Sequence, residues 1–146
     1  MESPFFIKDK FTALRKNLIR FLGDGGLPGF FAARRGEERA ALLADWIDLT
    51  VERDIHRFLK SRVKSGLARR ILEGLATLEH PDLSSIAKFC GRDPRLVKRH
   101  LTMLKELFVI EELSPHPWGV GKPIYFMCDV GLASSLGANF ARQLYT

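Results

Sequence analysis

The sequence lacks the long apolar run that a membrane-spanning helix requires. No stretch of its 146 residues approaches the roughly 20 consecutive apolar residues that cross a bilayer. The N-terminus, which begins Met1-Glu2-Ser3-Pro4, also lacks the basic start and apolar centre of a secretory signal peptide. These absences predict a cytoplasmic protein with no membrane partner.

Cysteine is scarce, and its spacing excludes the common metal sites. The two cysteines, Cys90 and Cys128, form no C-x-x-C pair and have no metal-like spacing to any of the four histidines. We therefore expect two buried free thiols in a reducing compartment, with no metal site and no cofactor.

Catalytic motifs are also missing. The pair Gly121-Lys122 resembles the end of a phosphate loop. Such a loop needs Ser or Thr directly after the lysine, where this chain has Pro123, and Gly five residues before the second glycine, where it has His116. The glycine-rich segment 23–29 has Pro28 in place of the third glycine of a dinucleotide fingerprint. Asp129 stands alone, without the second acid and lysine of a nuclease centre. We predict no catalytic residue, and the enzyme hypothesis is the weakest of three.

What is present is positive charge and helical periodicity. Lys and Arg exceed Asp and Glu by six, which favours partners with phosphate or acidic surfaces. Residues 5–22 place apolar side chains at helical spacing, and a loop at 23–29 follows. Residues 36–63 predict a second long helix with a charged, solvated face and a break near 60–66. The apolar positions of the two helices are Phe11, Leu14, Leu18, Phe21 and Leu22, then Leu43, Ile47, Val51, Ile55 and Phe58, with Trp46 also in the core.

The segment 66–130 has the element order of a winged helix-turn-helix domain. A helix from Leu67 ends before His80-Pro81, and a short helix at 84–90 with a serine cap stops at Gly91. Asp93-Pro94 is a strong helix start, and that third helix runs to about Leu107. Strands at 109–113 and 123–127 then flank a loop rich in Pro and Gly. We predict a mainly α protein: a helical lid or linker segment at 1–65, the winged helix at 66–130 and a helical tail at 131–146.

The third helix separates into an apolar side and a basic side. Val97, Leu101 and Leu104 share one side, His100 lies at its edge as a packing residue, and the opposite side holds cations with only Glu106 as an acid. In a helix-turn-helix protein this helix enters the major groove, while the preceding helix and the wing contact the backbone. The predicted DNA-binding residues are Arg92, Arg95, Lys98, Arg99, Thr102 and Lys105, with Ser84, Ser85 and Lys88 on the short helix and Lys122 on the wing, whose tip also carries His116 and Trp118.

A second hypothesis keeps the fold and changes the ligand. Winged helices also serve as protein-interaction modules, and a solvent-facing helix commonly carries several Lys and Arg. The basic side of the third helix would then dock on an acidic surface of a partner subunit. The sequence leaves duplex DNA and a protein partner as open alternatives, and it does not define the oligomeric state.

Three short motifs, in order, carry a family resemblance. They are Gly25-Gly26-Leu27-Pro28, Glu52-Arg53-Asp54-Ile55 and the run Tyr125 to Leu132. With the helix-turn-helix between them, residues 15–137 resemble the C-terminal part of a class of prokaryotic AAA-type ATPases. There the loop follows the ATPase lid, and the tyrosine turn introduces an endonuclease-like domain.

The resemblance has clear departures. The nucleotide-binding core and the endonuclease-like domain are absent, Thr50 replaces the usual tyrosine, and the tyrosine turn carries an extra residue. The resemblance implies a non-catalytic module whose helical segment 5–63 senses the state of an ATPase core, which would be its protein partner.

Overall fold

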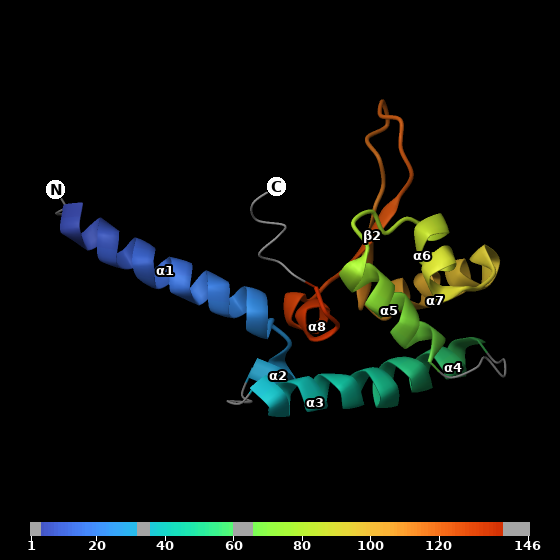
Figure 1. The fold of residues 1–146 in the computed structure, drawn as a ribbon, viewed down its shortest axis with the longest axis horizontal. Coiled ribbons are helices and arrows are strands. Elements are labelled where there is room, and N and C mark those ends of the chain that lie inside the picture. Colours follow the sequence, from blue (N-terminus) through green and yellow to red (C-terminus); the bar gives the residue numbers. More distant parts are fainter. Residues whose placement is uncertain (1–3, 32–35, 60–65, 139–146) are drawn as a thin grey trace.

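A computed structural model describes residues 4–31, 36–59 and 66–138. In these ranges the protein is mainly helical and carries one two-stranded antiparallel sheet (Figure 1). The elements are α1 (Pro4–Asp24), α2 (Pro28–Phe31), α3 (Gly36–Trp46), the π-helical segment η1 (Ile47–Glu52), α4 (Arg53–Leu59), α5 (Leu67–Thr77), α6 (Leu83–Cys90), α7 (Pro94–Glu106), β1 (Ile110–Leu113), β2 (Ile124–Met127) and α8 (Val130–Ser135). The predicted fold class, mainly α with a winged helix-turn-helix, is confirmed. None of the described helices is both long and apolar enough to span a membrane.

The winged helix forms where the local signals place it. Gly91 ends α6 in the left-handed conformation, at φ 61°, and the Asp93 carboxylate then caps α7 by accepting from the Arg95 N–H at 2.8 Å. Strands β1 and β2 pair antiparallel, with Ile110 opposite Met127. The N-cap of α6 is Asp82, not a serine as predicted, and its carboxylate accepts from the Ser85 N–H at 2.7 Å.

The helix after the loop contains a π-helical segment that its periodicity did not predict. Its buried residues Leu43, Ile47, Val51 and Ile55 repeat at a constant spacing of four. An α-helix has 3.6 residues per turn, so this spacing drifts by about 40° at each step. The wider turns of η1 correct the drift and keep all four side chains against the core. The predicted stripe is confirmed at these positions, while the side chain of Phe58 lies outside the described set.

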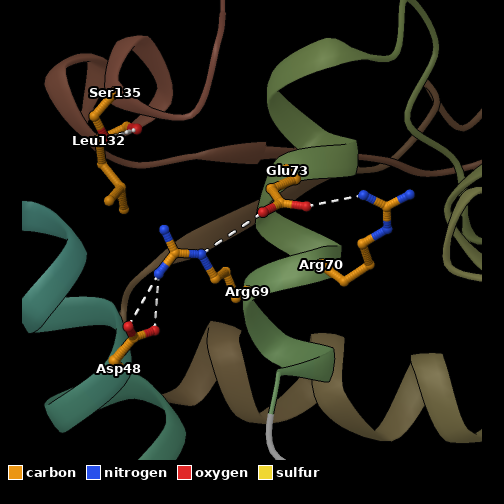
Figure 2. Close-up of polar contacts among 6 residues, drawn as sticks. All are labelled: Asp48, Arg69, Arg70, Glu73, Leu132 and Ser135. Carbon is orange, nitrogen blue, oxygen red and sulfur yellow. Dashed lines mark hydrogen bonds and ion pairs between the residues drawn. The ribbon is translucent and has the colours of Figure 1, made fainter.

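The helical segment and the winged helix share one hydrophobic core. Ile47 and Ile55 are buried together with Leu72 of α5 and Leu101 of α7. Arg69 of α5 adds a polar link, since it donates to both oxygens of Asp48 in η1, at 2.9 and 3.1 Å (Figure 2). The predicted division into domains stays a prediction, but the described core is continuous across position 65.

The helix α1 extends from the body as an arm (Figure 1). Four apolar residues on one side of it, which we call the α1 stripe, are solvent-exposed: Phe11, Leu14, Leu18 and Phe21. Phe11 is 69% exposed and Phe21 49%. Amphipathicity was predicted for this helix, and the structure shows that most of its apolar side has no partner among the described residues.

The end of α1 is joined to the start of α8. Gly25, with φ at 76°, lies against Gly131, and the Asp129 carboxylate accepts from the Gly26 N–H at 2.7 Å. Arg39 of α3 is buried and forms an ion pair with Asp24. The prediction of a solvated face is wrong for Arg39, because this arginine holds α3 to the end of α1.

The C-terminal helix is shorter than predicted. Instead of extending from 131 to 146, α8 ends at Ser135, and Gly137 follows in the left-handed region at φ 100°. A glycine in this conformation terminates a helix. The predicted tail beyond residue 138 lies outside the described residues.

Candidate nucleic-acid interface

Helix α7 has one packed side and one exposed side, as its periodicity predicts. Val97, Leu101 and Leu104 are buried against α5, α6 and the hairpin. His100 is also buried, and its Nδ1 lies 2.9 Å from the Leu96 carbonyl oxygen, which confirms a packing role. The exposed residues Arg95, Lys98, Arg99, Thr102 and Lys105 form what we call the basic face of α7.

The cations of this region differ in whether an acidic side chain pairs with them. Within the described parts of the chain, Arg95, Lys98 and Arg99 form no ion pair, and exposed Arg92 in the preceding turn forms none either. Lys105 differs because its ammonium donates to Glu112 of β1 at 3.2 Å. This hydrogen bond and the charge of Glu112 raise the pKa of Lys105. The N-terminal half of α7 therefore presents the uncompensated charge.

The hydroxyl proton of Thr102 is used in a hydrogen bond within α7. Its hydroxyl donates to the carbonyl oxygen of Lys98 at 3.0 Å, one turn earlier. The hydroxyl oxygen retains its capacity to accept, and the side chain remains exposed between the cations.

Asp82 organises the predicted site residues of α6 and the wing. Its carboxylate accepts from the hydroxyl of Ser84 at 2.8 Å and lies 3.4 Å from the ammonium of Lys122. The Ser85 backbone N–H, followed by the Ser84 hydroxyl, holds the pKa of Asp82 well below its usual range. Aspartate caps helices as well as serine does, so Asp82, two positions before the predicted helix, is the sequence signal that would have given the correct cap.

These contacts distinguish the predicted α6 residues. The Ser85 hydroxyl donates to the His80 carbonyl oxygen at 2.7 Å, so it stabilises the turn before α6. Ser84 receives a hydrogen bond from Lys122 at 3.3 Å. Lys88 is exposed on the same helix. A DNA contact by any of them stays a prediction, and the structure shows that the Ser85 hydroxyl is engaged by the turn before α6.

A hollow of about 420 Å³ lies between the basic face of α7 and the stem of the wing. Lys98, Thr102 and Lys105 line it from α7, and Lys122 and Tyr125 line it from the wing. The structure therefore places predicted site residues from two elements around one depression. Burial raises the pKa of the Tyr125 hydroxyl, which is protonated at neutral pH.

A second hollow, of about 290 Å³, lies at the base of α1. It is lined by Phe21, Trp46 and Phe108, together with the exposed Cys128. Trp46 packs edge-on to Phe30 with ring centroids 6.4 Å apart, which agrees with its predicted place at the core. The prediction of two buried thiols is wrong for Cys128, because the strand β2 ends just before it and leaves its side chain at the surface.

Among the described residues, no group of three or more His, Cys, Asp and Glu side chains is arranged to hold a metal ion. Arg69, Glu73 and Arg70 form the clearest polar cluster outside α7, with Glu73 between the two arginines (Figure 2). Arg70 also lies 4.3 Å above the Phe89 ring. These contacts connect α5 to η1 and α6, so the cluster has a structural role.

Comparison with known proteins assigns the chain to a family. No curated protein matches the sequence. Among solved structures, the MarR family transcription regulator SP03579 is 20% identical over 75% of this chain and 70% of that chain, with a TM-score of 0.42. RV1404 from Mycobacterium tuberculosis is 18% identical over 75% of this chain and 77% of that chain, with a TM-score of 0.40. The family model described as a domain of unknown function, DUF8612, matches residues 15–143. The chain therefore belongs to the DUF8612 family.

Proposed function

We propose that this protein is a non-catalytic winged-helix module that binds duplex DNA through α7. The observation that carries the proposal is the cluster of Arg92, Arg95, Lys98 and Arg99, exposed and without ion pairs to described residues. An ordinary surface helix mixes acids with its bases, whereas the first two turns of α7 contain no acid.

The geometry suits a helix in the major groove. The buried side of α7 faces the core, so the basic face is directed away from the domain, where arginine can contact guanine bidentately and lysine can contact phosphates. Lys88 on α6 and Arg92 in the turn extend the positive charge toward the DNA backbone. Lys105 contributes less because Glu112 already compensates its charge.

Two charge reversals with equal effect on net charge test the proposal. We expect Arg95→Glu to weaken duplex binding by about 1–3 kcal/mol and to lower the salt slope by about 0.9 for each phosphate that the protein no longer neutralises. The matched control is Arg57→Glu, an exposed arginine on α4. Fluorescence anisotropy over a range of salt concentrations measures both. The proposal is wrong if the two variants bind alike and both keep the melting temperature of the parent.

A second function, assembly, is favoured by the exposed α1 stripe. Phe11, Leu14, Leu18 and Phe21 repeat at alternating spacings of three and four, the pattern of a helix that packs along another helix. Basic residues of α1, including Arg15 and Lys16, lie outside the stripe.

The partner that fits this arm is a second copy of the chain. The outer side of α3 and η1 is acidic and exposes two leucines, Leu42 and Leu49, beside Glu38 and Asp45. Because each copy carries one basic apolar arm and one acidic apolar surface, reciprocal exchange would close a two-fold dimer. We propose this dimer as an assembly role that is compatible with DNA binding.

Sedimentation of two glutamate variants tests the dimer. Leu18→Glu should yield a monomer, whereas Ala13→Glu, which adds the same charge on the other side of α1, should leave the dimer intact. Raised salt should weaken the parent dimer because the surfaces are oppositely charged. A parent that sediments as a monomer at micromolar concentration, or a dimeric Leu18→Glu variant, would contradict this role.

The link to AAA-type ATPases remains a proposal. Neither the description of the family nor the names of the two structures above mention such an ATPase. Two of the motifs that carry the resemblance are in contact in the fold, which supports the link. The Gly26 N–H, in the Gly-Gly-Leu-Pro loop, donates a hydrogen bond to Asp129, in the run Tyr125 to Leu132. Stable co-purification with an AAA-type ATPase core, abolished by Arg53→Glu, would support the link, and failure to associate with that core would count against it.

A further inference from the structure

The tip of the wing is apolar and projects into solvent. Residues 114–123 join β1 to β2, and the outer part of this loop, 114–121, includes Pro115, Pro117 and Val120 but no Lys, Arg, Asp or Glu. The Trp118 side chain is 91% exposed, and Val120 is fully exposed. Burying a tryptophan in a partner removes a large apolar area from water, so this tip is suited to contact a surface.

Hydrogen bonds within the loop constrain the backbone at Trp118. The Gly119 N–H donates to the His116 carbonyl oxygen at 2.7 Å, which closes a tight turn. The Trp118 N–H lies 3.2 Å from Nδ1 of the same histidine and donates to it. Because the backbone that carries the indole is already constrained, less conformational entropy is lost when the loop binds a partner.

The wing stands beside the basic face of α7. Lys98 and Lys105 of α7 line the same hollow as Lys122 and Pro123 at the base of the wing. A duplex that lies along α7 would meet the wing on this side. Figure 1 shows the hairpin rising well beyond the helices, so its tip reaches further than its base.

The wing is poorly equipped to hold phosphate. Lys122 is the only Lys or Arg between positions 110 and 127, and its ammonium is engaged by Asp82 at 3.4 Å and Ser84 at 3.3 Å. The stem adds two acids, Glu111 and Glu112. Without an available positive charge, the wing would have to contact a part of the DNA other than its phosphates.

We propose that the wing tip contacts nucleobases, with the indole of Trp118 stacking on a base face. This inference rests on the proposed DNA-binding function and deepens it. Every base offers a π-face, and aromatic side chains stack on unpaired bases or enter a base step as a wedge. The shared chemistry is a nucleobase face, from a duplex step or from an unpaired base.

Tryptophan fluorescence tests this contact. The chain has two tryptophans, so the Trp46→Phe variant leaves Trp118 as the single reporter. Its emission should be quenched on titration with a blunt 20-base-pair duplex, with the same midpoint as the anisotropy of labelled DNA. If Trp46→Phe fails to fold, the difference between the wild-type and Trp118→Phe titrations provides the same signal.

Substitutions at the tip separate stacking from charge. Trp118→Ala should weaken binding roughly 5- to 150-fold, the range for removal of one base–aromatic stack, and leave the salt slope unchanged. Trp118→Phe should keep most of the affinity, and Val120→Ala is the matched control on the same loop. Quenching by a duplex whose two ends are closed by hairpin loops indicates a wedge, whereas quenching only by a duplex with free ends or an unpaired overhang indicates stacking on a terminal or unpaired base.

The two failures are distinguishable. Anisotropy that shows binding while Trp118 emission stays constant and Trp118→Ala binds like the parent overturns the stacking inference and leaves the proposed function intact. Absence of binding to every DNA at low salt overturns both. A Trp118→Lys variant that binds more tightly than wild type and has a steeper salt slope would show a phosphate-facing tip, which also contradicts stacking.

Discussion

The carboxylate of Asp129 accepts a hydrogen bond from the backbone N–H of Gly26, 103 positions earlier in the chain, at 2.7 Å. The same carboxylate accepts from the Leu132 N–H at 2.8 Å and so caps α8. One side chain therefore begins the last described helix and attaches it to the loop that follows the first.

This junction tolerates no added side chain at Gly131. A Cβ there would lie 2.5 Å from the Asp24 carbonyl oxygen and 2.7 Å from the Gly25 Cα, and backbone atoms cannot easily move away. We expect Gly131→Ala to lower the free energy of unfolding by about 1–3 kcal/mol, measured by urea denaturation. The control is Gly23→Ala, where nothing lies within 4 Å of the new Cβ. Equal stability of the two variants would show that the close approach is not maintained in solution.

The cap of α6 predicts a dependence of stability on pH. The pKa of Asp82 is lowered in the folded protein, first by the Ser85 N–H and then by the Ser84 hydroxyl. The stabilisation is therefore complete above the unfolded pKa, near 4, and is lost as the pH falls toward the folded pKa. Asp82→Ala should cost about 0.5–2 kcal/mol at pH 7 and less at pH 3.

Thermal unfolding at several pH values measures this difference. Glu79→Ala is the comparison, because it removes an exposed carboxylate from the loop after α5 with the same change of net charge. A gap between wild type and Asp82→Ala that stays constant from pH 7 to pH 3 would argue against an ionised cap.

The two thiols should react at different rates. Cys128 is exposed and Cys90 is half-buried. Partial desolvation raises the pKa of both thiols, and the charges of Glu111 and Asp129 raise that of Cys128 further. Only the thiolate is nucleophilic, so a thiol reagent should modify Cys128 slowly at pH 7 and about tenfold faster for each pH unit until the raised pKa is reached. Cys128→Ser should remove the faster phase, and its persistence in that variant would assign it to Cys90.

The local elements of the winged helix were predictable because their signals are local. Asp93-Pro94 and Gly91 define the ends of helices through backbone conformation and capping, which depend on a few neighbouring residues. The two sides of α7 were predictable for the same reason, since periodicity alone places Val97 opposite Arg95. The π-helical turns of η1 were not foreseen, because they follow from how four side chains meet a core assembled from other helices.

The sequence by itself determined which residues share a side of each helix, and with that the basic face of α7 and the apolar tip of the wing. Only the tertiary structure decided what those sides meet. It buried Arg39 against Asp24, left the α1 stripe in solvent and engaged Lys122 with Asp82. The physical reason is that periodicity depends on neighbours within a few residues, whereas burial and charge pairing depend on segments far apart in the chain, such as Gly26 and Asp129.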